Sequence, residues 1–212
     1  MSKPVVVLGA GGHAAVLVDL LTEQGRAPLA LVAPERPAGR EALAALPLLS
    51  EAQLQQQWTP QQVELVNGIG MLPGDSLRQR VFERFSALGY GFATLVCDSA
   101  RVSRFARLAP GSQVLSGAIV QAGAEIGANS LINTAASVDH DCRLAAHVHI
   151  APGARLCGQV QIGEGAFVGA NATVIQGLTI GSEAIVGAAS LLKQDLAAQT
   201  RWSLNMTGGG HG

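Results

Sequence analysis

Three of the five histidines in the sequence lie close together in the segment NTAASVDHDCRLAAHVHI. They are His140, His147 and His149, and the carboxylates Asp139 and Asp141 flank the first of them. A neutral imidazole near pH 7 can take a proton from an attacking amine or hydroxyl. A carboxylate on the other ring nitrogen fixes the tautomer and raises the basicity. The pattern therefore offers His140 as a candidate general base, and its neighbour Asp141 as a carboxylate that could orient the ring.

The rest of the chain has the composition of a core-rich globular protein. Of its 212 residues, 48% are hydrophobic, 14% are charged and 4% are aromatic, and 26 are glycine. The formal net charge of −1 gives no electrostatic grip on nucleic acid or a membrane surface. Cys97, Cys142 and Cys157 form no CxxC pair, and the apolar run VVVL is too short for a signal peptide. These features predict a cytoplasmic protein with reduced thiols.

A six-residue repeat runs through the second half. Every sixth residue from Val102 to Leu192, sixteen in all, is Val, Ile or Leu. This period fits neither a helix nor a long strand, and it predicts a solenoid in which three hexapeptides make one triangular coil with the aliphatic side chain inside. Glycines recur directly after the aliphatic position, where we expect them to relieve strain at sharp bends; they are Gly127, Gly163, Gly169, Gly181 and Gly187.

The first half predicts a small parallel α/β domain, because strands and helices alternate along it. We expect strands at 4–9, 28–32, 63–70 and 92–97, and helices at 11–25 and 76–90. This Rossmann-like domain should pack on the first coil of the solenoid and shield its open end. The predicted domains are residues 1–97 for the α/β unit, 98–195 for the solenoid and 196–212 for a tail.

The repeat also fixes where the histidines must lie. His140 follows the inward Val138 by two positions and should point out of the prism, on a rigid face. His140 and His149 are nine residues apart, half a coil, so they lie on different faces of one chain. A closed threefold assembly could bring His149 of one chain beside His140 of the next.

The order of motifs resembles one bacterial family. The segments VVVLGAGGHA, LVNGIG, LRQRVFERF, GYGFATLVCDSARV, SVDHDC and HVHIAPGA follow one another over roughly residues 4–195. This order is similar to that of the nucleotide-aminosugar N-acetyltransferases of surface-glycan synthesis and their sialic acid O-acetyltransferase relatives. The resemblance implies a left-handed parallel β-helix of hexapeptide repeats, a homotrimer with active sites between subunits, and acetyl-CoA as co-substrate.

The resemblance also implies roles for particular residues. The base and its supporting acid fall on His140 and Asp141. The residues expected to line the acetyl-CoA groove are His149, Gly158, Ala170 and Ala188. The strand-to-helix turn GAGGH favours a phosphate at its backbone N–H groups. The residues expected to bind the sugar nucleotide are Gly11, Gly12, His13, Gly68, Gly70 and Asn133.

Several alternatives remain open at this stage. The acceptor could be the hydroxyl of a sialic or related nonulosonic acid instead of an amine on a nucleotide-linked 4-amino-deoxysugar. The chain could also be a non-catalytic, nucleotide-binding trimeric sensor. A zinc site built from the three histidines is disfavoured, because His147 and His149 alternate along a strand and face opposite ways; no metal is expected and His147 is interpreted as structural.

Two departures from the family pattern concern the ligands. Ala33 and Pro34 stand where relatives often carry aspartates that touch the nucleotide base, so the base (uracil, guanine or thymine) is left open. The C-terminal sequence RWSLNMTGGGHG also lacks the Gly-x-Pro-Ala segment that relatives often place near the CoA arm.

Overall fold

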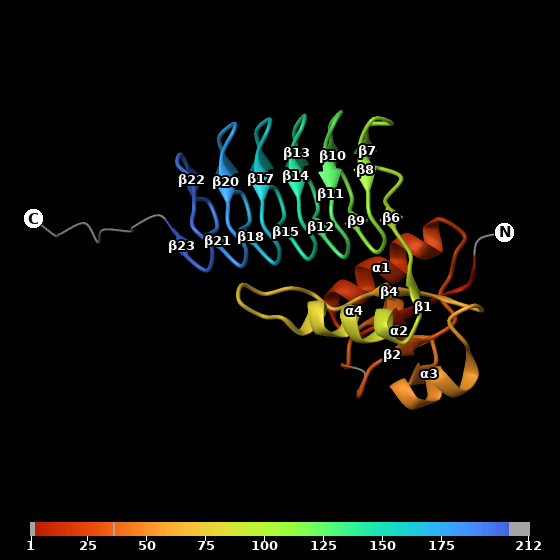
Figure 1. Ribbon diagram of the computed structural model, residues 1–212. Coiled ribbons are helices and arrows are strands. Elements are labelled where there is room, and N and C mark those ends of the chain that lie inside the picture. The colour runs from red at the N-terminus through yellow and green to blue at the C-terminus, as the bar shows by residue number, and fades with distance from the viewer. Residues whose placement is uncertain (1–2, 36, 204–212) are drawn as a thin grey trace, which may run out of the picture.

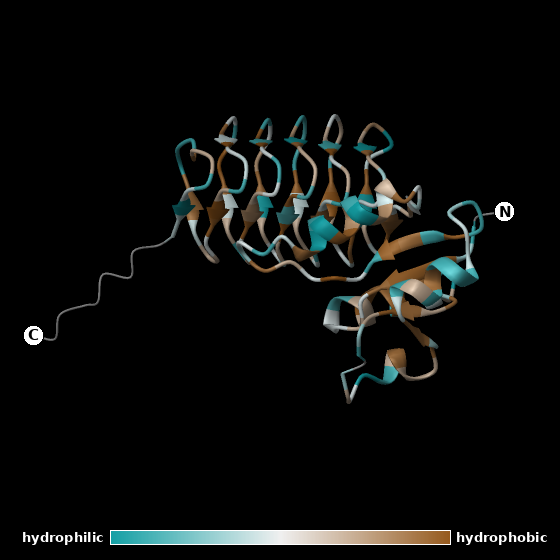
Figure 2. Cartoon of the chain, turned by 60° about the horizontal axis from the view of Figure 1, so that its bottom comes forward, coloured by the Kyte–Doolittle hydropathy of each residue, from teal (hydrophilic) through white to brown (hydrophobic). Residues whose placement is uncertain are grey.

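The N-terminal half of the computed structural model is a five-stranded parallel sheet with helices around it. The structure describes residues 3–35 and 37–203. The strands are β1 (Val5–Leu8), β2 (Leu31–Val32), β3 (Leu48–Leu49), β4 (Glu64–Asn67) and β5 (Gly91–Phe92), and the helices are α1 (Gly12–Glu23), α2 (Glu41–Ala44), α3 (Glu51–Gln57) and α4 (Leu77–Ala87). The order β3-β2-β1-β4-β5 is that of an open α/β sheet. Figure 2 shows the apolar strands at the centre of this domain.

Residues 95–203 form a three-sided parallel β-helix (Figure 1). One side contains β6 (Leu95–Val96), β9 (Gln113–Val114), β12 (Leu131–Ile132), β15 (His149–Ile150), β18 (Phe167–Val168), β21 (Ile185–Val186) and β23 (Arg201–Trp202). The second contains β7 (Arg101–Val102), β10 (Ile119–Val120), β13 (Ser137–Val138), β16 (Arg155–Leu156), β19 (Thr173–Val174) and β22 (Leu191–Leu192). The third contains β8 (Arg107–Leu108), β11 (Glu125–Ile126), β14 (Arg143–Leu144), β17 (Gln161–Ile162) and β20 (Thr179–Ile180). We call these sides B, C and D.

The predicted solenoid and its inward aliphatics are confirmed. The repeat positions from Val114 to Leu192 are all buried and form one cluster that fills the prism. Aligned neighbours are 18 residues apart, as Ile119 and Ser137 are. The last coil is two residues shorter, because β23 pairs Arg201 with Ile185.

The glycines do not act as predicted. The left-handed backbone recurs every sixth residue from Gly111 to Ala189, three positions after the aliphatic, and the residues there are often not glycine. The glycines directly after the aliphatic have no such φ value. A Cβ on Gly163 would lie 2.8 Å from the Gly181 carbonyl carbon, so the residue is needed because the next coil approaches closely and not because the chain bends.

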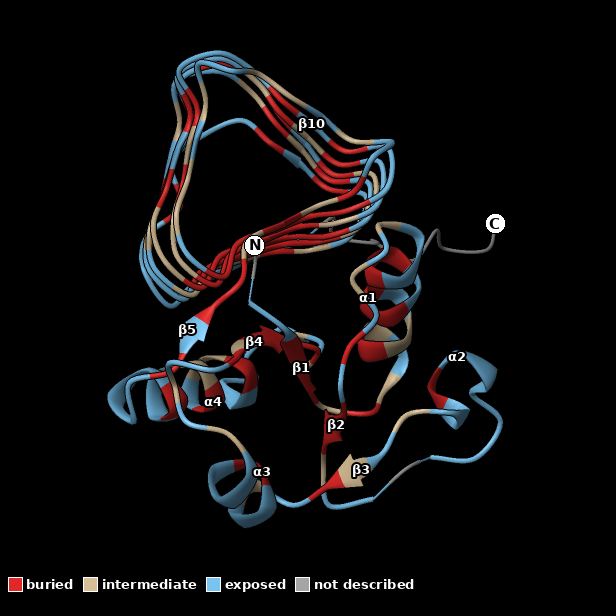
Figure 3. Cartoon of the chain, turned by 90° about the vertical axis from the view of Figure 1, so that its right-hand side faces the viewer, coloured by how far each residue is buried: buried red, intermediate tan, exposed pale blue. Residues whose placement is uncertain are grey.

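The N-terminal domain packs on the side of the solenoid instead of covering its end. The buried cluster that contains the inner face of α1 also includes Leu95, Leu115 and Leu131, which come from the solenoid's B-side strands and an adjoining turn. Figure 3 shows the N-terminal domain beside this buried side of the solenoid. The inward Val102 and Leu108 of the first coil remain half-buried. The predicted packing is thus present, but the expected shielding of the open end is wrong, because the apolar outward residues lie on the side.

Three predicted boundaries differ in detail. The predicted strand 92–97 is two strands in two sheets: Phe92 ends β5, and β6 begins the solenoid at Leu95, three residues before the predicted start at 98. The predicted tail from 196 still contributes β23 to the solenoid, while 204–212 lie outside the described residues.

Within the described part of the chain, every helix is too short or too polar to span a membrane.

Candidate active site

The His140 and Asp141 side chains form a hydrogen-bonded pair on the corner between β13 and β14. Nδ1 of His140 lies 2.9 Å from Oδ2 of Asp141, and both side chains are more than half exposed. Asp141 adopts the left-handed φ of 58° that the corner imposes, which an aspartate tolerates better than most residues. Asp139 instead accepts from the main-chain N–H of His140 at 2.7 Å, so it fixes the backbone and not the ring.

The electrostatics of this pair suit a base. The hydrogen bond that His140 donates to Asp141 raises the pKa of His140; desolvation opposes this rise, and the charges of Asp139 and Asp141 add to it. An ionised carboxylate accepts only, so the neutral imidazole carries its proton on Nδ1 and presents the lone pair of Nε2.

Glycines one coil away on either side make room for the pair. Gly123 lies one coil before Asp141, and a Cβ there would meet its carboxylate. Gly158 lies one coil after His140, and a Cβ there would come within 2.5 Å of Cε1 and still nearer Nε2. The His140 ring therefore packs directly on the main chain of Gly158, a residue that was predicted to line the acetyl-CoA groove.

His149 lies elsewhere, buried on side B. Its Nε2 is 3.1 Å from Nδ2 of Asn133, whose Oδ1 accepts from the Thr134 N–H. The amide must therefore donate to Nε2, which places the His149 proton on Nδ1. That nitrogen makes no hydrogen bond of ordinary geometry among the described residues, although the nearby Met71 main chain acts on the ring and opposes the fall in its pKa. Burial, followed by the charges of Arg78 and His13, lowers the pKa of His149 to about 3, so the ring is a neutral donor.

A cavity of about 470 Å³ brings most of the predicted sugar-nucleotide residues together with His149. It lies between the N-terminal domain and side B, and five predicted residues line it: Gly12, His13, Gly70, Asn133 and His149. The two halves of the chain thus build one cavity from segments far apart in sequence.

The orientation of His13 in this cavity is set by an amide. Nε2 of Gln113 donates to the Asn67 carbonyl at 2.9 Å, so its Oε1 accepts from Nε2 of His13 at 2.8 Å. His13 therefore carries its proton on Nε2 and leaves Nδ1 as an acceptor. Burial, followed by the charge of Arg78, lowers the pKa of His13 to about 4.

A second groove, of about 700 Å³, runs along side B toward the C-terminal coils. It contains His149 and the predicted CoA-lining Ala170 and Ala188. Met71 and His149 line both this groove and the cavity of about 470 Å³, which we call the sugar cavity after the residues predicted to line it. The two spaces therefore meet at His149.

The remaining predicted residues lie apart from this junction. Gly11 lines a cavity of about 660 Å³ with Ala33 and Pro34, at the carboxyl ends of β1, β2 and β4. Gly68 is packed tightly, since a Cβ there would lie 2.7 Å from Val7 and 2.8 Å from the Leu8 carbonyl. His140 and Gly158 belong to the C–D corner and line neither side-B space.

Sequence reasoning missed Arg78, which is completely buried in α4. Its guanidinium donates to the carbonyls of Asn67 at 2.9 Å and Ile69 at 2.8 Å, and lies 3.4 Å from that of Asn129. It thereby ties the end of β4 to the solenoid. Burial lowers the pKa of Arg78 to about 9. Nothing in the polar pattern of α4 distinguishes Arg78 from its exposed neighbours.

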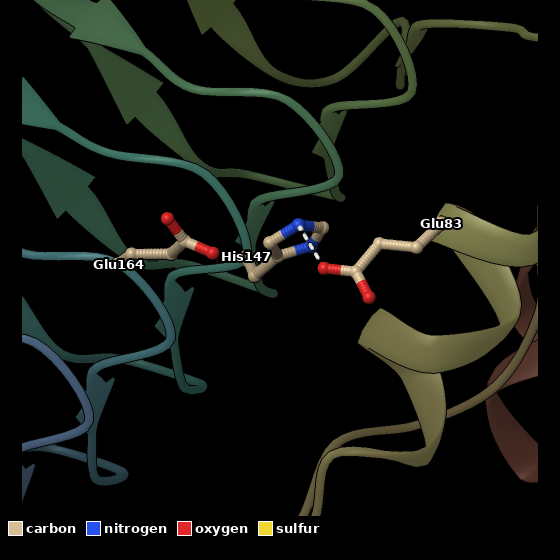
Figure 4. A group of neighbouring side chains, drawn as sticks. All are labelled: Glu83, His147 and Glu164. Carbon is tan, nitrogen blue, oxygen red and sulfur yellow. Dashed lines mark ion pairs between the residues drawn. The ribbon is translucent and has the colours of Figure 1, made fainter. Parts of the chain in front are cut away.

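His147 belongs to an ionic cluster between α4 and the solenoid. Its Nε2 lies 3.8 Å from Glu83, and Glu164 is also beside it (Figure 4). Oδ1 of Asn129 accepts from Asn67, so Nδ2 of Asn129 must donate to Nδ1 of His147. The proton of neutral His147 then lies on Nε2, toward the acids. One ligand atom from each of Glu83, His147 and Glu164 lies within 4.8 Å of the other two, so the Nε2–H of the neutral ring faces two carboxylates.

The fold and the two grooves define an acyltransferase of the left-handed β-helix class. The family described as PglD N-terminal domain matches residues 4–85, and the hexapeptide repeat of succinyl-transferase matches residues 159–192. The acetyltransferase domain of PglB from Neisseria gonorrhoeae, solved with acetyl coenzyme A, is 30% identical with a TM-score of 0.87; the match covers 97% of this chain and 98% of that one.

Two further solved structures are similar over nearly their whole length. PerB from Caulobacter crescentus, solved with CoA and GDP-perosamine, is 34% identical with a TM-score of 0.84, and the match covers 95% of this chain and 94% of that one. WeeI from Acinetobacter baumannii shares the fold at 20% identity, with a TM-score of 0.84 and coverage of 97% and 98%. A search of curated protein sequences gives no match.

The chain belongs to the hexapeptide-repeat family of nucleotide-aminosugar N-acetyltransferases and sialic acid O-acetyltransferases of bacterial glycan synthesis. It is an acetyl-CoA-dependent sugar acetyltransferase.

Proposed function

We propose that this enzyme transfers the acetyl group of acetyl-CoA to the exocyclic amine of a nucleotide-linked 4-amino-deoxysugar, with His140 as general base. The observation that carries the proposal is the 2.9 Å contact between His140 and Asp141, which leaves Nε2 of an exposed ring free to accept a proton. The complex of the related PerB with GDP-perosamine supports an amino-sugar nucleotide as acceptor.

The reaction is a direct attack. Nε2 of His140 takes a proton from the amine as its nitrogen bonds to the thioester carbonyl carbon. Main-chain N–H groups of the groove, with the Nδ1–H of His149, stabilise the oxyanion. The C–S bond then breaks, and the CoA thiolate takes the proton back from His140. An acyl-enzyme is not needed. Burial raises the pKa of Cys142 to about 11, which makes that thiol a poor nucleophile.

The site is formed between subunits of a homotrimer in this proposal. His149 and the side-B spaces come from one chain, while the His140 corner comes from its neighbour. Support comes from the arrangement in one chain, where the base lies on the C–D corner and both ligand spaces lie along side B.

The nucleotide is proposed to cross the GAGGH turn. Gly11 lines the apolar cavity at the strand ends, and Gly12 and His13 line the sugar cavity, so a diphosphate between them would meet the N-terminus of α1. This helix has no acidic residue in its first turn, and the Arg40 guanidinium lies 3.4 Å from where a Cβ on Gly12 would be. Both features favour an anion.

The test is CoA release from acetyl-CoA with UDP-, GDP- and dTDP-linked 4-aminosugars and with free sialic acid. Turnover with one of the amines supports the proposal. Turnover with sialic acid alone would identify an O-acetyltransferase. Tight nucleotide binding without any turnover would favour the non-catalytic sensor, and loss of turnover with a chelator would point to a metal.

A further inference from the structure

The side-B groove ends at a cationic side chain. Arg201 and Ser203 line its far end, and Arg201 is the one Lys or Arg among the described lining residues. The other walls are small or apolar, including Pro73, Ala151 and Phe167. Of the described carboxylates, none forms an ion pair with Arg201.

The strand register aims Arg201 into the groove. The adjacent Trp202 packs against the prism core, and its indole N–H donates to the Leu191 carbonyl at 3.1 Å. Successive side chains on a strand point to opposite sides, so Arg201 points outward. It continues the outward row of His149, Phe167 and Ile185. The shortened last coil places an arginine in this row.

The row fixes the direction of the bound CoA. The acetyl end must lie at His149, where the groove meets the sugar cavity. The pantetheine arm then runs along the coils away from the N-terminal domain. From His149 to Arg201 there are three strand spacings, about 14 Å in total. An extended pantetheine arm has a comparable length, so the diphosphate of CoA, which follows the arm, lies beside the Arg201 guanidinium.

We propose that Arg201 recognises the diphosphate of acetyl-CoA. The inference rests on the acetyl-CoA half of the proposed function and is independent of the acceptor sugar. A guanidinium binds a phosphate with paired, charge-assisted hydrogen bonds, and this positions the arm without touching the reacting atoms.

The experiment measures equilibrium binding of CoA, 3′-dephospho-CoA and pantetheine to the wild type and to Arg201→Gln. Arg201→Gln should weaken CoA binding by about tenfold to a hundredfold, the scale of a charged hydrogen bond, and leave pantetheine binding unchanged. The same factor should appear with 3′-dephospho-CoA. Arg80→Gln, an exposed arginine of α4 that does not line the groove, is the matched control and should bind CoA normally.

Each other outcome overturns the assignment. A factor that disappears with 3′-dephospho-CoA would assign Arg201 to the 3′-phosphate. An equal loss for pantetheine would mean that the substitution distorts the groove. Unchanged CoA binding would remove Arg201 from recognition altogether. Arg201→Lys preserves the charge and should retain part of the affinity, which guards against a folding defect in Arg201→Gln. Because no acceptor is present, failure of this inference is distinguishable from an incorrect acceptor sugar.

Discussion

The imidazole of His140 rests directly on the main chain of Gly158, one coil further along the solenoid. A Cβ on Gly158 would come within 2.5 Å of Cε1 of the ring. Since the parallel pairing of β13 with β16 fixes the spacing between these coils, the ring has a rigid floor on one side and the Asp141 carboxylate at its Nδ1. Its orientation is therefore set by the backbone of the neighbouring coil as well as by its acid.

Replacing Gly158 by alanine should therefore displace the base. We expect Gly158→Ala to lower kcat by at least about tenfold, because a misplaced general base loses much of its contribution. The melting temperature should change little, since the ring is exposed and can move into solvent. Gly91→Ala is the control, as a Cβ there meets nothing within 4 Å. Full activity in Gly158→Ala would show that the ring has another orientation during catalysis.

Removing the base itself gives a second prediction. His140→Ala should lower kcat by at least about a hundredfold, the scale of general base catalysis, while CoA binding is retained. The variant should be compared with the wild type by CoA release and by calorimetric titration with CoA. Retained turnover would refute the assigned role.

Mixed trimers test whether the base acts across the subunit boundary. His140→Ala and His149→Ala subunits, each inactive alone, should regain activity when unfolded and refolded together. In a mixed trimer, one interface can carry both native histidines. If the two histidines acted within one chain, the activity of the refolded mixture would not exceed that of the two variants measured separately.

The solenoid could be predicted in detail because its signal is repeated. Sixteen aliphatic positions, each with the same environment, leave little freedom in where a coil begins. The predicted position of the strained backbone at its corners was wrong, because a sequence shows where glycines occur but not why each one is needed. Gly163 avoids a clash with the next coil, whereas Ala135 and Asp141 accept the left-handed backbone without being glycine.

Motifs single out candidate site residues, whereas tertiary contacts decide which of them meet. The motif residues Gly12, His13 and Asn133 line one cavity with His149, which the resemblance assigned to the acetyl-CoA groove, and their roles stay predictions. Arg78 was missed, since its environment is created by three backbone carbonyls from segments up to 51 residues away. Such contacts depend on how α4 docks on the solenoid, which no local pattern encodes.

The pH dependence of catalysis should report the Asp141 contact. The hydrogen bond to Asp141 raises the pKa of His140, so kcat/KM should fall on the acidic side with an apparent pKa above 6.5. Asp141→Asn removes the charge and should move this limb to lower pH, with kcat reduced about tenfold or more. Asp139→Asn is the control and should shift the limb less, because Asp139 bonds the main chain and not the ring. An unmoved limb in Asp141→Asn would separate the carboxylate from the base.

The folded protein should lose stability as the pH falls from 6.5 to 5. The pKa of His149 is lowered from 6.5 to about 3 and that of His13 to about 4, chiefly by burial, and burial lowers the pKa of His147 as well. Each group contributes stability that is complete above 6.5 and declines below it, because the unfolded chain then binds more protons. The slope approaches about 1.4 kcal/mol per pH unit for each of His149 and His13, whose folded-state pKa values lie below this window.

The raised pKa of His140 provides the contrast needed to test this dependence. Its contribution is complete below pH 6.5 and constant within the window, so His140→Ala should keep the wild-type slope. His149→Gln removes one buried imidazole and should make the slope shallower by about one group's share. Urea unfolding at several pH values and one fixed protein concentration measures both variants. Equal slopes in His149→Gln and the wild type would mean that His149 titrates normally and is open to water in the folded enzyme.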